Sequence, residues 1–542
     1  MKFKIPFLIA LIFSILFVFS NFAHAKEEVD KIRTGLLHRR NSADFYQVDS
    51  TQGLVFSLIE EWSYEQFPSK HIIYNHEDES PVTVTKDVYY NDKGSDFSLQ
   101  DSNGEFIPNK YIKVGESTGD FEEAQDFLWV YKQMGIDVFY YFDGRYNFVI
   151  GPFKEVENAL EKIKDLQERY EDVSFDVIDS QKKRLLVLDN ELDPLLLFYV
   201  PDYELSIYPD GDSLLRYNQN EERVYRGSFS TYRLDNGNFV LVNILPIEEY
   251  LYGVVPYEIG GSVPIEAIKA QAIAARNYVY NSMRKYESEN FDLCNTVYSQ
   301  VYRGVFGESE NTNKGVDETK GLLLKYEGSN AAVFYFSSTG GTMTENVENV
   351  WGGSFPYLKA VDSSFETDTT YNYTWTVKKS YDEIENMLSS RGIRVGKLLD
   401  LNVKLSSEAG RVLNLEIIGK DDKHTISRSS TRNTFNLPSQ SYEIIMDNRV
   451  NIASSKETVE SSLANLNVLS ANGKSNITEP VNVFDGTDLK SIDIYPSKFE
   501  FVGRGWGHGI GLSQNGAIAM ANEGSSYDEI LMHYFPGTYI GQ

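Results

Sequence analysis

The sequence predicts an α+β protein that is rich in β-strands, with one long helix and a small ferredoxin-like domain. Apolar runs of strand length, separated by turn residues, recur along most of the 542 residues. A strand–helix–strand pattern occurs twice within residues 106–180. An Ala-rich helical segment lies at 264–286, with strands predicted on both sides. Hydrophobic residues make up 41% and charged residues 24%, as in a folded chain with room for about three domains.

Residues 1–25 have the pattern of a secretory signal peptide. Lys2 and Lys4 precede an apolar run at 7–19, and Ala23-His24-Ala25 supplies the small-x-small pattern that a signal peptidase needs. A membrane-spanning helix needs about 20 apolar residues, so we expect cleavage after Ala25; an uncleaved signal anchor is the alternative. Either way the protein is expected outside the cytoplasm, secreted or cell-wall associated, with no membrane span after cleavage.

The sequence pattern predicts a β-rich N-terminal segment at residues 26–105, called the lead-in below. It predicts a separate domain at residues 106–180. Within the latter, strands are expected at 111–114, 136–142, 146–150 and 173–178, and helices at 121–134 and 154–170. Gly135 ends the first helix, and Asp143-Gly144 is a hairpin signal. Two βαβ halves of this size predict a four-stranded sheet with two helices on one face.

This domain resembles a SPOR domain. The resemblance is carried by YIKVG at 111–115 and by YNFVIGPFKEVENALEKI at 146–163, with Gly-Pro-Phe directly after a strand. SPOR domains bind peptidoglycan glycan strands stripped of their stem peptides. The resemblance implies sugar contacts on an exposed sheet face carrying Tyr111, Lys113, Tyr146 and Phe148. Any other ferredoxin-like α+β module is the alternative interpretation.

Residues 184–542 are interpreted as one long region. Strands are expected near 184–188, 204–208, 224–234 and 238–245, followed by a short helix at 246–254 and the long helix, for which Ser262 is the expected N-cap. Residues 451–490 are rich in Ser, Asn and Thr, which predicts a polar surface insertion.

Three stretches of this region together resemble the SpoIID/LytB family of peptidoglycan-remodelling proteins. They lie at 243–280, 334–362 and 503–540, in the order that the family has them. The resemblance implies a mixed α+β domain with a substrate groove. The stage II sporulation protein D branch contains lytic transglycosylases that act on peptide-free glycan strands. The LytB branch contains enhancers of cell-wall amidases.

The catalytic glutamate of the transglycosylases lies in a V-P-x-E motif, which here is VPYE at 255–258 and implies Glu258. From composition alone, Glu258 is one of many loop carboxylates. A glycoside hydrolase usually needs two carboxylates. A lytic transglycosylase uses the C6 hydroxyl of its own substrate as the nucleophile, so one glutamate can protonate the glycosidic oxygen and then accept the hydroxyl proton.

The segment SSTGGT at 337–342 follows an apolar strand. Its residues Ser338, Thr339, Gly340 and Gly341 could offer hydroxyls and backbone amides to a sugar; a tight turn is the alternative interpretation. Glu345 is a second carboxylate that could line the same groove.

Glycine alternates with larger residues along GRGWGHGIG at 503–511. The spacing matches neither a dinucleotide-binding fingerprint nor a phosphate loop. Alternate glycines on a strand would leave one face bare for close approach of a backbone or a sugar. Arg504, Trp506 and His508 would project on the other face, with Trp506 stacking on a sugar, His508 hydrogen-bonding it and Gln514 joining them. Tight core packing is the alternative.

Charge and cysteine content restrict the partners. The net charge is −28, which argues against a nucleic-acid partner. Some SpoIID proteins bind zinc through His and Cys residues after the long helix, but here residues 291–304 hold Cys294, the single cysteine, and no histidine. We therefore predict a buried, inert Cys294, no metal and no cofactor. This departure slightly favours the LytB-like branch.

Two functions lead. The favoured one is a lytic transglycosylase that cleaves MurNAc–GlcNAc bonds of peptide-free glycan strands to 1,6-anhydro ends. The other is a noncatalytic amidase enhancer that binds peptidoglycan and stimulates an N-acetylmuramoyl-L-alanine amidase. A structural spore or wall protein is a third interpretation. The expected partners are glycan strands and a cell-wall amidase.

Overall fold

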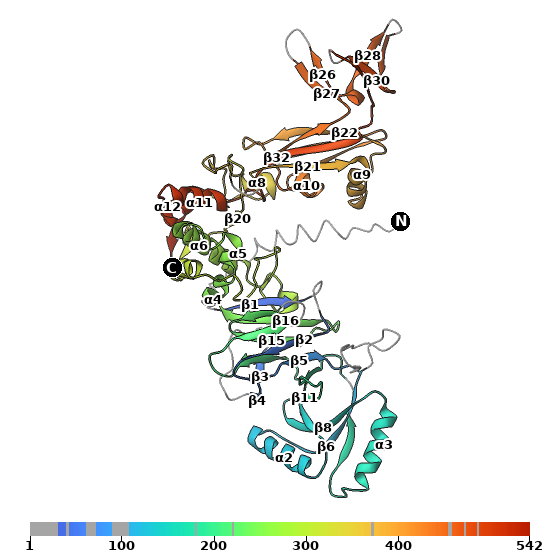
Figure 1. The fold of residues 1–542 in the computed structure, drawn as a ribbon, viewed down its shortest axis with the longest axis vertical. Helices are drawn as coiled ribbons and strands as arrows, with labels where there is room; N and C mark the ends of the chain where they lie inside the picture. The colour runs from blue at the N-terminus through green and yellow to red at the C-terminus, as the bar shows by residue number, and fades with distance from the viewer. Residues whose placement is uncertain are drawn as a thin grey trace. The chain divides into compact units, whose positions relative to one another are not determined.

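The computed structural model describes residues 31–38, 43–60, 72–88, 108–178, 181–218, 222–369, 373–453, 458–470, 473–484 and 487–542. The expected signal peptide at 1–25 lies outside these residues. The described residues form two compact units, one from the ranges 31–257 and 279–313 and the other from the ranges 258–278 and 314–542. Figure 1 shows their helices and strands. Both combine strands and helices, so the predicted α+β class is confirmed.

The first unit contains a seven-stranded sheet in the order β17-β1-β16-β15-β12-β3-β4. Its strands are, in that order, Leu293–Cys294, Lys31–Leu37, Phe239–Pro246, Ser228–Arg233, Tyr203–Pro209, Leu54–Glu60 and Ile72–His76. Strand β1 pairs antiparallel with β16, although more than 200 residues separate them in the chain. A buried ion pair from Arg33 to Glu204, with a shortest N–O distance of 2.6 Å, joins β1 to β12. The lead-in is therefore part of the same sheet as residues from the following region.

A ten-stranded sheet completes the first unit, in the order β14-β13-β2-β5-β10-β11-β7-β8-β6-β9. Its strands are, in that order, Glu222–Tyr225, Leu215–Asn218, Phe45–Asp49, Val82–Lys86, Leu185–Leu188, Pro194–Phe198, Phe139–Phe142, Tyr146–Phe153, Lys110–Thr118 and Phe175–Ile178. The strands of the ferredoxin-like block form one end of this sheet, because β7 pairs in parallel with β11.

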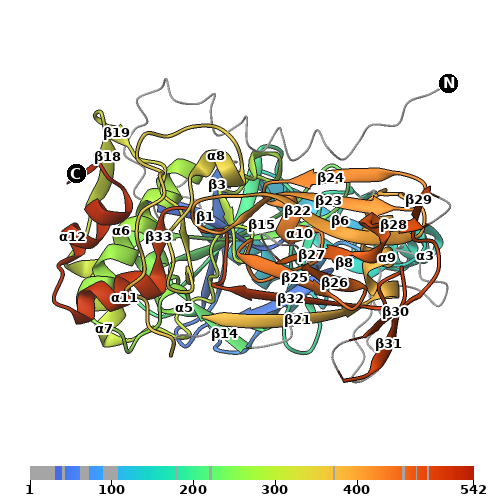
Figure 2. The ribbon, with the colours of Figure 1, turned by 90° about the horizontal axis from the view of Figure 1, so that it is seen from above.

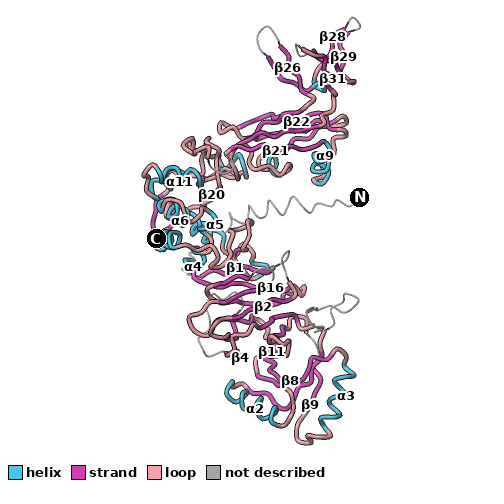
Figure 3. Tube along the Cα trace, in the orientation of Figure 1, coloured by secondary structure: helices cyan, strands magenta, loops and turns pink. Residues whose placement is uncertain are grey.

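The block from β6 to β9 has the ferredoxin-like arrangement that the sequence predicts. Helix α2 (Phe121–Gln133) follows β6, and α3 (Val156–Gln167) follows β8 (Figure 3). The four strands lie in the spatial order fourth, first, third, second, and every neighbouring pair is antiparallel. Helix α2 begins where the Asp120 carboxylate accepts the backbone N–H of Glu123 at 2.9 Å, and Gly135, with φ +81°, follows its end.

The long helix α6 (Ile265–Ser282) ends four residues earlier than expected. Arg284 adopts a left-handed conformation, with φ 61°, and the chain turns there. The middle of α6 is buried almost all round rather than along one stripe, since every residue from 267 to 277 except Lys269 is buried. Small side chains permit this packing: a Cβ on Gly315 of α7 (Glu310–Asp317) would clash with Ile268.

The second unit is built from small sheets (Figure 2). One consists of β21, β32 and β25 (Thr374–Ser380, Lys498–Arg504 and Tyr442–Met446), and another of β22, β23 and β24 (Leu398–Ser406, Val412–Gly419 and Lys423–Ser427). Their apolar faces and helix α9 (Tyr381–Ser390) share one buried core. The smaller pairings are β19-β18-β34 (Ser329–Asn330, Leu323–Tyr326 and Tyr539–Gly541) and β20-β33 (Tyr335–Phe336 and Leu512–Ser513). The remaining helices are α8 (Val347–Val350), α10 (Ser430–Asn433), α11 (Gln514–Asn522) and α12 (Tyr527–Tyr534).

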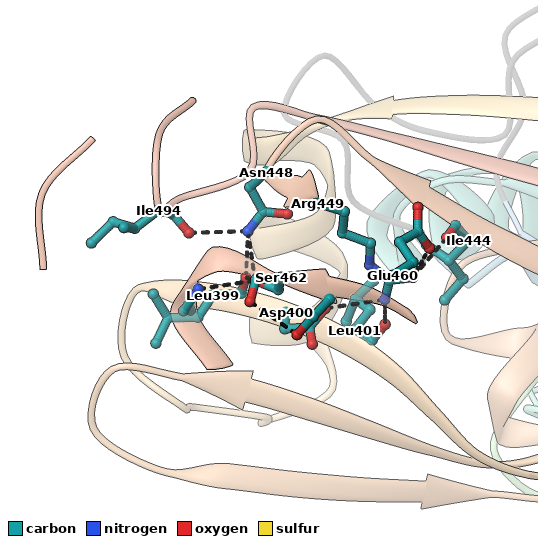
Figure 4. A network of polar contacts seen from close by, with 11 residues as sticks. Leu399, Asp400, Leu401, Ile444, Asn448, Arg449, Glu460, Ser462 and Ile494 are labelled. Carbon is teal, nitrogen blue, oxygen red and sulfur yellow. Dashed lines mark hydrogen bonds and ion pairs between the residues drawn. The ribbon is translucent and has the colours of Figure 1, made fainter. Parts of the chain in front are cut away.

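The polar segment at 451–490 contributes to three hairpins. These pair β26 with β27 (Arg449–Ala453 and Thr458–Ser462), β28 with β29 (Asn467–Ser470 and Gly473–Asn476), and β30 with β31 (Val481–Phe484 and Leu489–Ile492). Asn448 and Arg449, where the first hairpin begins, bind neighbouring segments of the second unit (Figure 4). The Asn448 amide donates to the Leu399 and Ile494 carbonyls at 2.9 and 3.0 Å, and Arg449 pairs with Asp400 at 3.2 Å.

Among the residues that the structure describes, no helix is long and apolar enough to cross a membrane.

Candidate functional site

Glu258 is the last residue of the short helix α5 (Val255–Glu258), and its side chain is partly buried. Gln514, the first residue of α11, places its Nε2 3.5 Å from Oε2 of Glu258. The hydroxyl of Ser513 caps α11 by accepting the backbone N–H of Gly516 at 3.3 Å, which fixes the position of Gln514. Two residues singled out from motifs 256 positions apart therefore lie together in the second unit.

The segment at 337–342 is organised around a carboxylate that the sequence analysis missed, Glu366. The side chains of Ser338 and Thr339 are buried and donate to Glu366 at 2.5 and 2.6 Å. The backbone N–H groups of Thr339 and Gly340 donate to the same carboxylate at 2.9 and 3.3 Å. These hydroxyls and amides are used within the protein, as the tight-turn interpretation expects. Glu366 stands in no recognisable motif, so only the fold reveals it.

Gly340 and Gly341 make close backbone approach possible. Both have positive φ, +71° and +72°. A Cβ on Gly340 would lie 2.5 Å from the backbone nitrogen of Gly505, and one on Gly341 would clash with Tyr373. Any larger residue at either position would therefore be strained and crowded.

Glu345 is buried, with 1% of its surface exposed. Its Oε1 accepts the backbone N–H of Asn346 and the side-chain amide of Asn349, both at 2.8 Å. Its Oε2 has no hydrogen-bond partner among the described residues. The backbone N–H of Glu345 donates to the Gly509 carbonyl at 2.7 Å, which connects this segment to the glycine-rich one.

The glycine-rich segment is not the continuous strand that the sequence predicts. Strand β32 ends at Arg504, and the next four alternate glycines, at 505, 507, 509 and 511, all have positive φ. Such angles break the extended conformation. The expected close approach of backbone does occur: Trp506 and Ser338 exchange backbone hydrogen bonds at 2.9 and 3.1 Å.

The three large side chains of this segment differ in exposure. Arg504 is exposed, Trp506 is 39% exposed and His508 is partly buried. The His508 ring contacts Trp351, with ring centroids 4.7 Å apart, and its Nδ1 accepts the backbone N–H of Ile510 at 3.0 Å. Burial, and then the charges of Arg432 and Arg411, lower the pKa of His508 to about 3. His508 is therefore neutral near pH 7, when it can hydrogen-bond but cannot act as a cationic acid.

Arg411 is a second residue that the sequence analysis missed. It is fully buried, and its Nε, Nη1 and Nη2 have no hydrogen-bond partner among the described residues. A Cβ on Gly509 would clash with its guanidinium group, so glycine makes room for it. Burial lowers the pKa of Arg411 to about 10; the charge of Arg432 acts in the same direction, whereas Glu345 and Glu366 oppose the shift.

A pocket of about 450 Å³ adjoins Trp506. Its lining residues are Arg391, Arg432, Asn433, Asn436, Leu437, Pro438 and Trp506. Apart from Trp506, none of these was singled out from the sequence, because they follow α9 and surround α10, outside the three family stretches. The pocket combines an aromatic ring with guanidinium and amide groups.

The expected exposed sheet face of the ferredoxin-like block is wrong, because Tyr111, Tyr146 and Phe148 are all buried. Both faces of the sheet are covered. On one face, the Phe148 ring lies 5.3 Å from that of Tyr131 on α2. On the other face, Tyr111 shares a buried core with Leu186 and Leu197. Lys113 is partly buried.

The exposed aromatic residues of this block lie elsewhere. A pocket of about 340 Å³ is formed by α2 with β4 and β7. It is lined by Tyr74, Asn75, Phe121, Gln125, Leu128, Trp129, Lys132, Gln133 and Tyr140, and Trp129 is 65% exposed.

Cys294 is buried, as expected, and its Sγ lies 3.2 to 3.4 Å from the hydroxyls of Thr296, Tyr286 and Ser299. Burial raises the pKa of Cys294, but these hydrogen bonds together lower it below its ordinary value. Within the described ranges, no group of three or more His, Cys, Asp and Glu side chains is arranged to hold a metal ion.

Comparison with known proteins finds a matching family model and several relatives. Residues 235–326 match the family described as Stage II sporulation protein, and residues 345–462 match a domain of unknown function. The amidase enhancer of Bacillus subtilis is 34% identical over 305 residues, which cover 54% of this chain and 40% of that protein. Stage II sporulation protein D of Bacillus subtilis is 27% identical over 340 residues, which cover 58% of this chain and 79% of that protein.

An uncharacterized protein of Brachyspira hyodysenteriae is also similar, with 28% identity over 309 residues that cover 56% of this chain and 69% of that protein. The relatives with assigned names thus represent both branches that the sequence motifs resemble. Together with the three motif stretches in their order, these matches support the similarity of the chain to the SpoIID/LytB family.

Proposed function

We propose that this protein is an extracytoplasmic lytic transglycosylase that cleaves MurNAc–GlcNAc bonds in peptide-free glycan strands, with Glu258 as its acid and base. The observation that carries the proposal is the approach of Gln514 to Glu258, at 3.5 Å. It brings together the first and third family stretches at a carboxylate. An amide donor orients a carboxylate without adding a charge.

The chemistry needs only one titrating group. Protonated Glu258 donates its proton to the glycosidic oxygen as the bond from that oxygen to C1 of MurNAc breaks. Ionised Glu258 then accepts the proton of the C6 hydroxyl as O6 bonds to C1, which gives the 1,6-anhydro end and restores the acid. His508 is neutral near pH 7, so it suits a hydrogen-bonding role better than that of the proton donor.

The proposal includes binding of the cell wall by the ferredoxin-like block. Since the sheet face is buried, the pocket between α2 and β4 is the better candidate for sugar contacts. Tyr74 and Trp129 offer rings on which a sugar can stack, and Asn75, Gln125 and Gln133 offer amides.

The second candidate is a noncatalytic amidase enhancer. The relative that carries this name is 34% identical, whereas the stage II sporulation protein D relatives are 27% and 26% identical. In this case the protein would bind glycan without cleaving it, and the measurable effect would be a higher rate of a partner amidase.

Mass spectrometry of peptide-free glycan strands tests the proposal. The strands are incubated with the protein, with Glu258→Gln and with Glu523→Gln, a control that changes an exposed glutamate of the second unit. We expect anhydromuramic ends from the protein and from the control, and none from Glu258→Gln. Absence of cleavage by the unchanged protein, together with faster release of stem peptides from peptide-bearing peptidoglycan by an added amidase in a parallel assay, would instead establish the enhancer.

A further inference from the structure

We infer that the pocket formed by Trp506, Arg432 and Arg391 binds the free lactyl carboxylate of a peptide-free muramoyl residue. This inference rests on the proposed function and names the chemical group that the site selects. A stem peptide is joined to MurNAc through an amide of the lactyl group. When the peptide is removed, the neutral amide becomes a carboxylate, so a negative charge directly on the lactyl group distinguishes peptide-free strands from peptide-bearing ones.

The lining of the pocket suits an anion. It contains two guanidinium groups and two side-chain amides, and its lining residues include no carboxylate. This is unusual for the chain as a whole, in which 79 acidic residues outnumber 51 basic ones. Guanidinium groups bind carboxylates through charge-assisted and often bidentate hydrogen bonds.

The backbone around the pocket holds the two arginines in place. Arg432 donates from Nε to the Leu437 carbonyl at 2.9 Å, and no other hydrogen bond of its side chain is found in the described part of the chain. Its Nη1 and Nη2 therefore remain available for a ligand. Arg391 donates to the carbonyl of Asn433, which brings its guanidinium to the same wall.

A further positive charge, that of Arg411, lies close to Arg432. Arg432 and the buried Arg411 are close enough to act on one another and on His508, whose pKa both of them lower. The carboxylates that act on Arg411 are Glu345 and Glu366, and neither lines the pocket. A bound anion would offset the repulsion between these guanidinium groups.

Trp506 connects the pocket to the reacting centre. Its backbone pairs with Ser338, and the Pro438 carbonyl in the pocket wall accepts the N–H of Gly507 at 2.9 Å. The same glycine-rich segment then leads, through β33, to Gln514 beside Glu258. With 39% of its surface exposed, the Trp506 ring can stack on the sugar that carries the carboxylate.

Calorimetric binding to two matched tetrasaccharides tests this inference. Both contain MurNAc and GlcNAc; one has free lactyl carboxylates and the other has lactyl carboxamides. All proteins carry Glu258→Gln, which prevents turnover. We expect the carboxylate probe to bind about tenfold more tightly than the carboxamide. Adding Arg432→Gln should remove that preference, and adding Arg391→Gln should reduce it.

Two further variants test other contributions to probe binding. One tests nonspecific attraction by a nearby positive charge, and the other tests stacking on Trp506. Arg394→Gln changes an exposed arginine near Arg391 that does not line the pocket, and it should keep the tenfold preference. Trp506→Ala should weaken both probes by the same factor, because stacking does not depend on the carboxylate. Circular dichroism of each variant confirms folding, and Arg391, being exposed, is the position least sensitive to misfolding.

Equal binding of both probes, or a preference that survives both arginine substitutions, would overturn the inference. Stronger competition by poly(glycerol phosphate) than by the carboxylate probe would also overturn it, in favour of a phosphate polymer. Failure of the proposed function looks different, since the unchanged protein would then release no anhydro ends while the carboxylate preference persisted.

Discussion

Replacing Glu366 by Gln should destabilise the second unit strongly although it removes no volume. The carboxylate accepts hydrogen bonds from four side-chain hydroxyls and from two backbone N–H groups. The hydroxyls are those of Ser338, Thr339, Ser363 and Ser513, at 2.5 to 3.1 Å, and the N–H groups are those of Thr339 and Gly340. Glu366 thus joins the 337–342 segment to β33 and to its own loop.

The expected magnitude follows from these donors. Hydroxyls can rotate to accept a hydrogen bond from the new amide, but backbone N–H groups cannot. One buried donor is therefore left without an acceptor, at a cost of about 1 to 3 kcal/mol, and the remaining hydrogen bonds lose the contribution of the charge. We expect the free energy of unfolding to fall by about 3 kcal/mol.

Urea unfolding followed by tryptophan fluorescence measures this change. Three of the five tryptophans, Trp351, Trp375 and Trp506, belong to the second unit. The matched control is Glu523→Gln, an exposed site at which a change within about 0.5 kcal/mol is expected. A loss smaller than about 1 kcal/mol for Glu366→Gln would refute the claim that this carboxylate organises the 337–342 segment.

Three other outcomes are expected. The folded-state pKa of His508, about 3, lies below its ordinary value of 6.5, so unfolding takes up a proton below pH 6.5 and stability is lost as the pH falls from 6.5 toward 3. His508→Gln should make that loss shallower in urea titrations between pH 4 and 7, by up to about 1.4 kcal/mol per pH unit, and an unchanged slope would contradict the assignment. Gly509→Ala should cost more than Gly524→Ala by at least about 1 kcal/mol in the same assay, because both glycines have positive φ but only the first would clash, with a buried guanidinium. Trp129→Ala should reduce cosedimentation with amidase-treated cell walls, whereas Leu160→Ala, at another exposed apolar position, should not; equal retention by both variants would exclude the α2 pocket from wall binding.

Local sequence signals predicted the ferredoxin-like block well. The 3.6-residue period of its helices, the glycine after the first helix and the Asp-Gly hairpin are properties of a few neighbouring residues. Its strand order, fourth, first, third, second, was not specified by the sequence pattern and comes from the structure. The exposure of its sheet face was predicted wrongly, because Tyr111 packs against Leu186 and Leu197, which lie outside the block and give no local signal within it.

The glycine-rich segment shows the limit of pattern analysis. Alternation has the period of a strand, but it is equally compatible with alternating positive φ, which glycine adopts readily. Tertiary packing decides between these conformations. The backbone of residues 334–339 approaches the glycines at 505 and 511 so closely that a Cβ would overlap it.

The sequence by itself determined the fold class, the family stretches and the identity of Glu258 as the carboxylate to test. It could not find Glu366, Arg411 or Arg432, because each stands in a segment with no motif. Only the tertiary structure decided their environments, since burial, unpaired donors and neighbouring charge arise when distant segments pack together. The same packing brought Gln514 to Glu258 and used the hydroxyls of the 337–342 segment for internal hydrogen bonds.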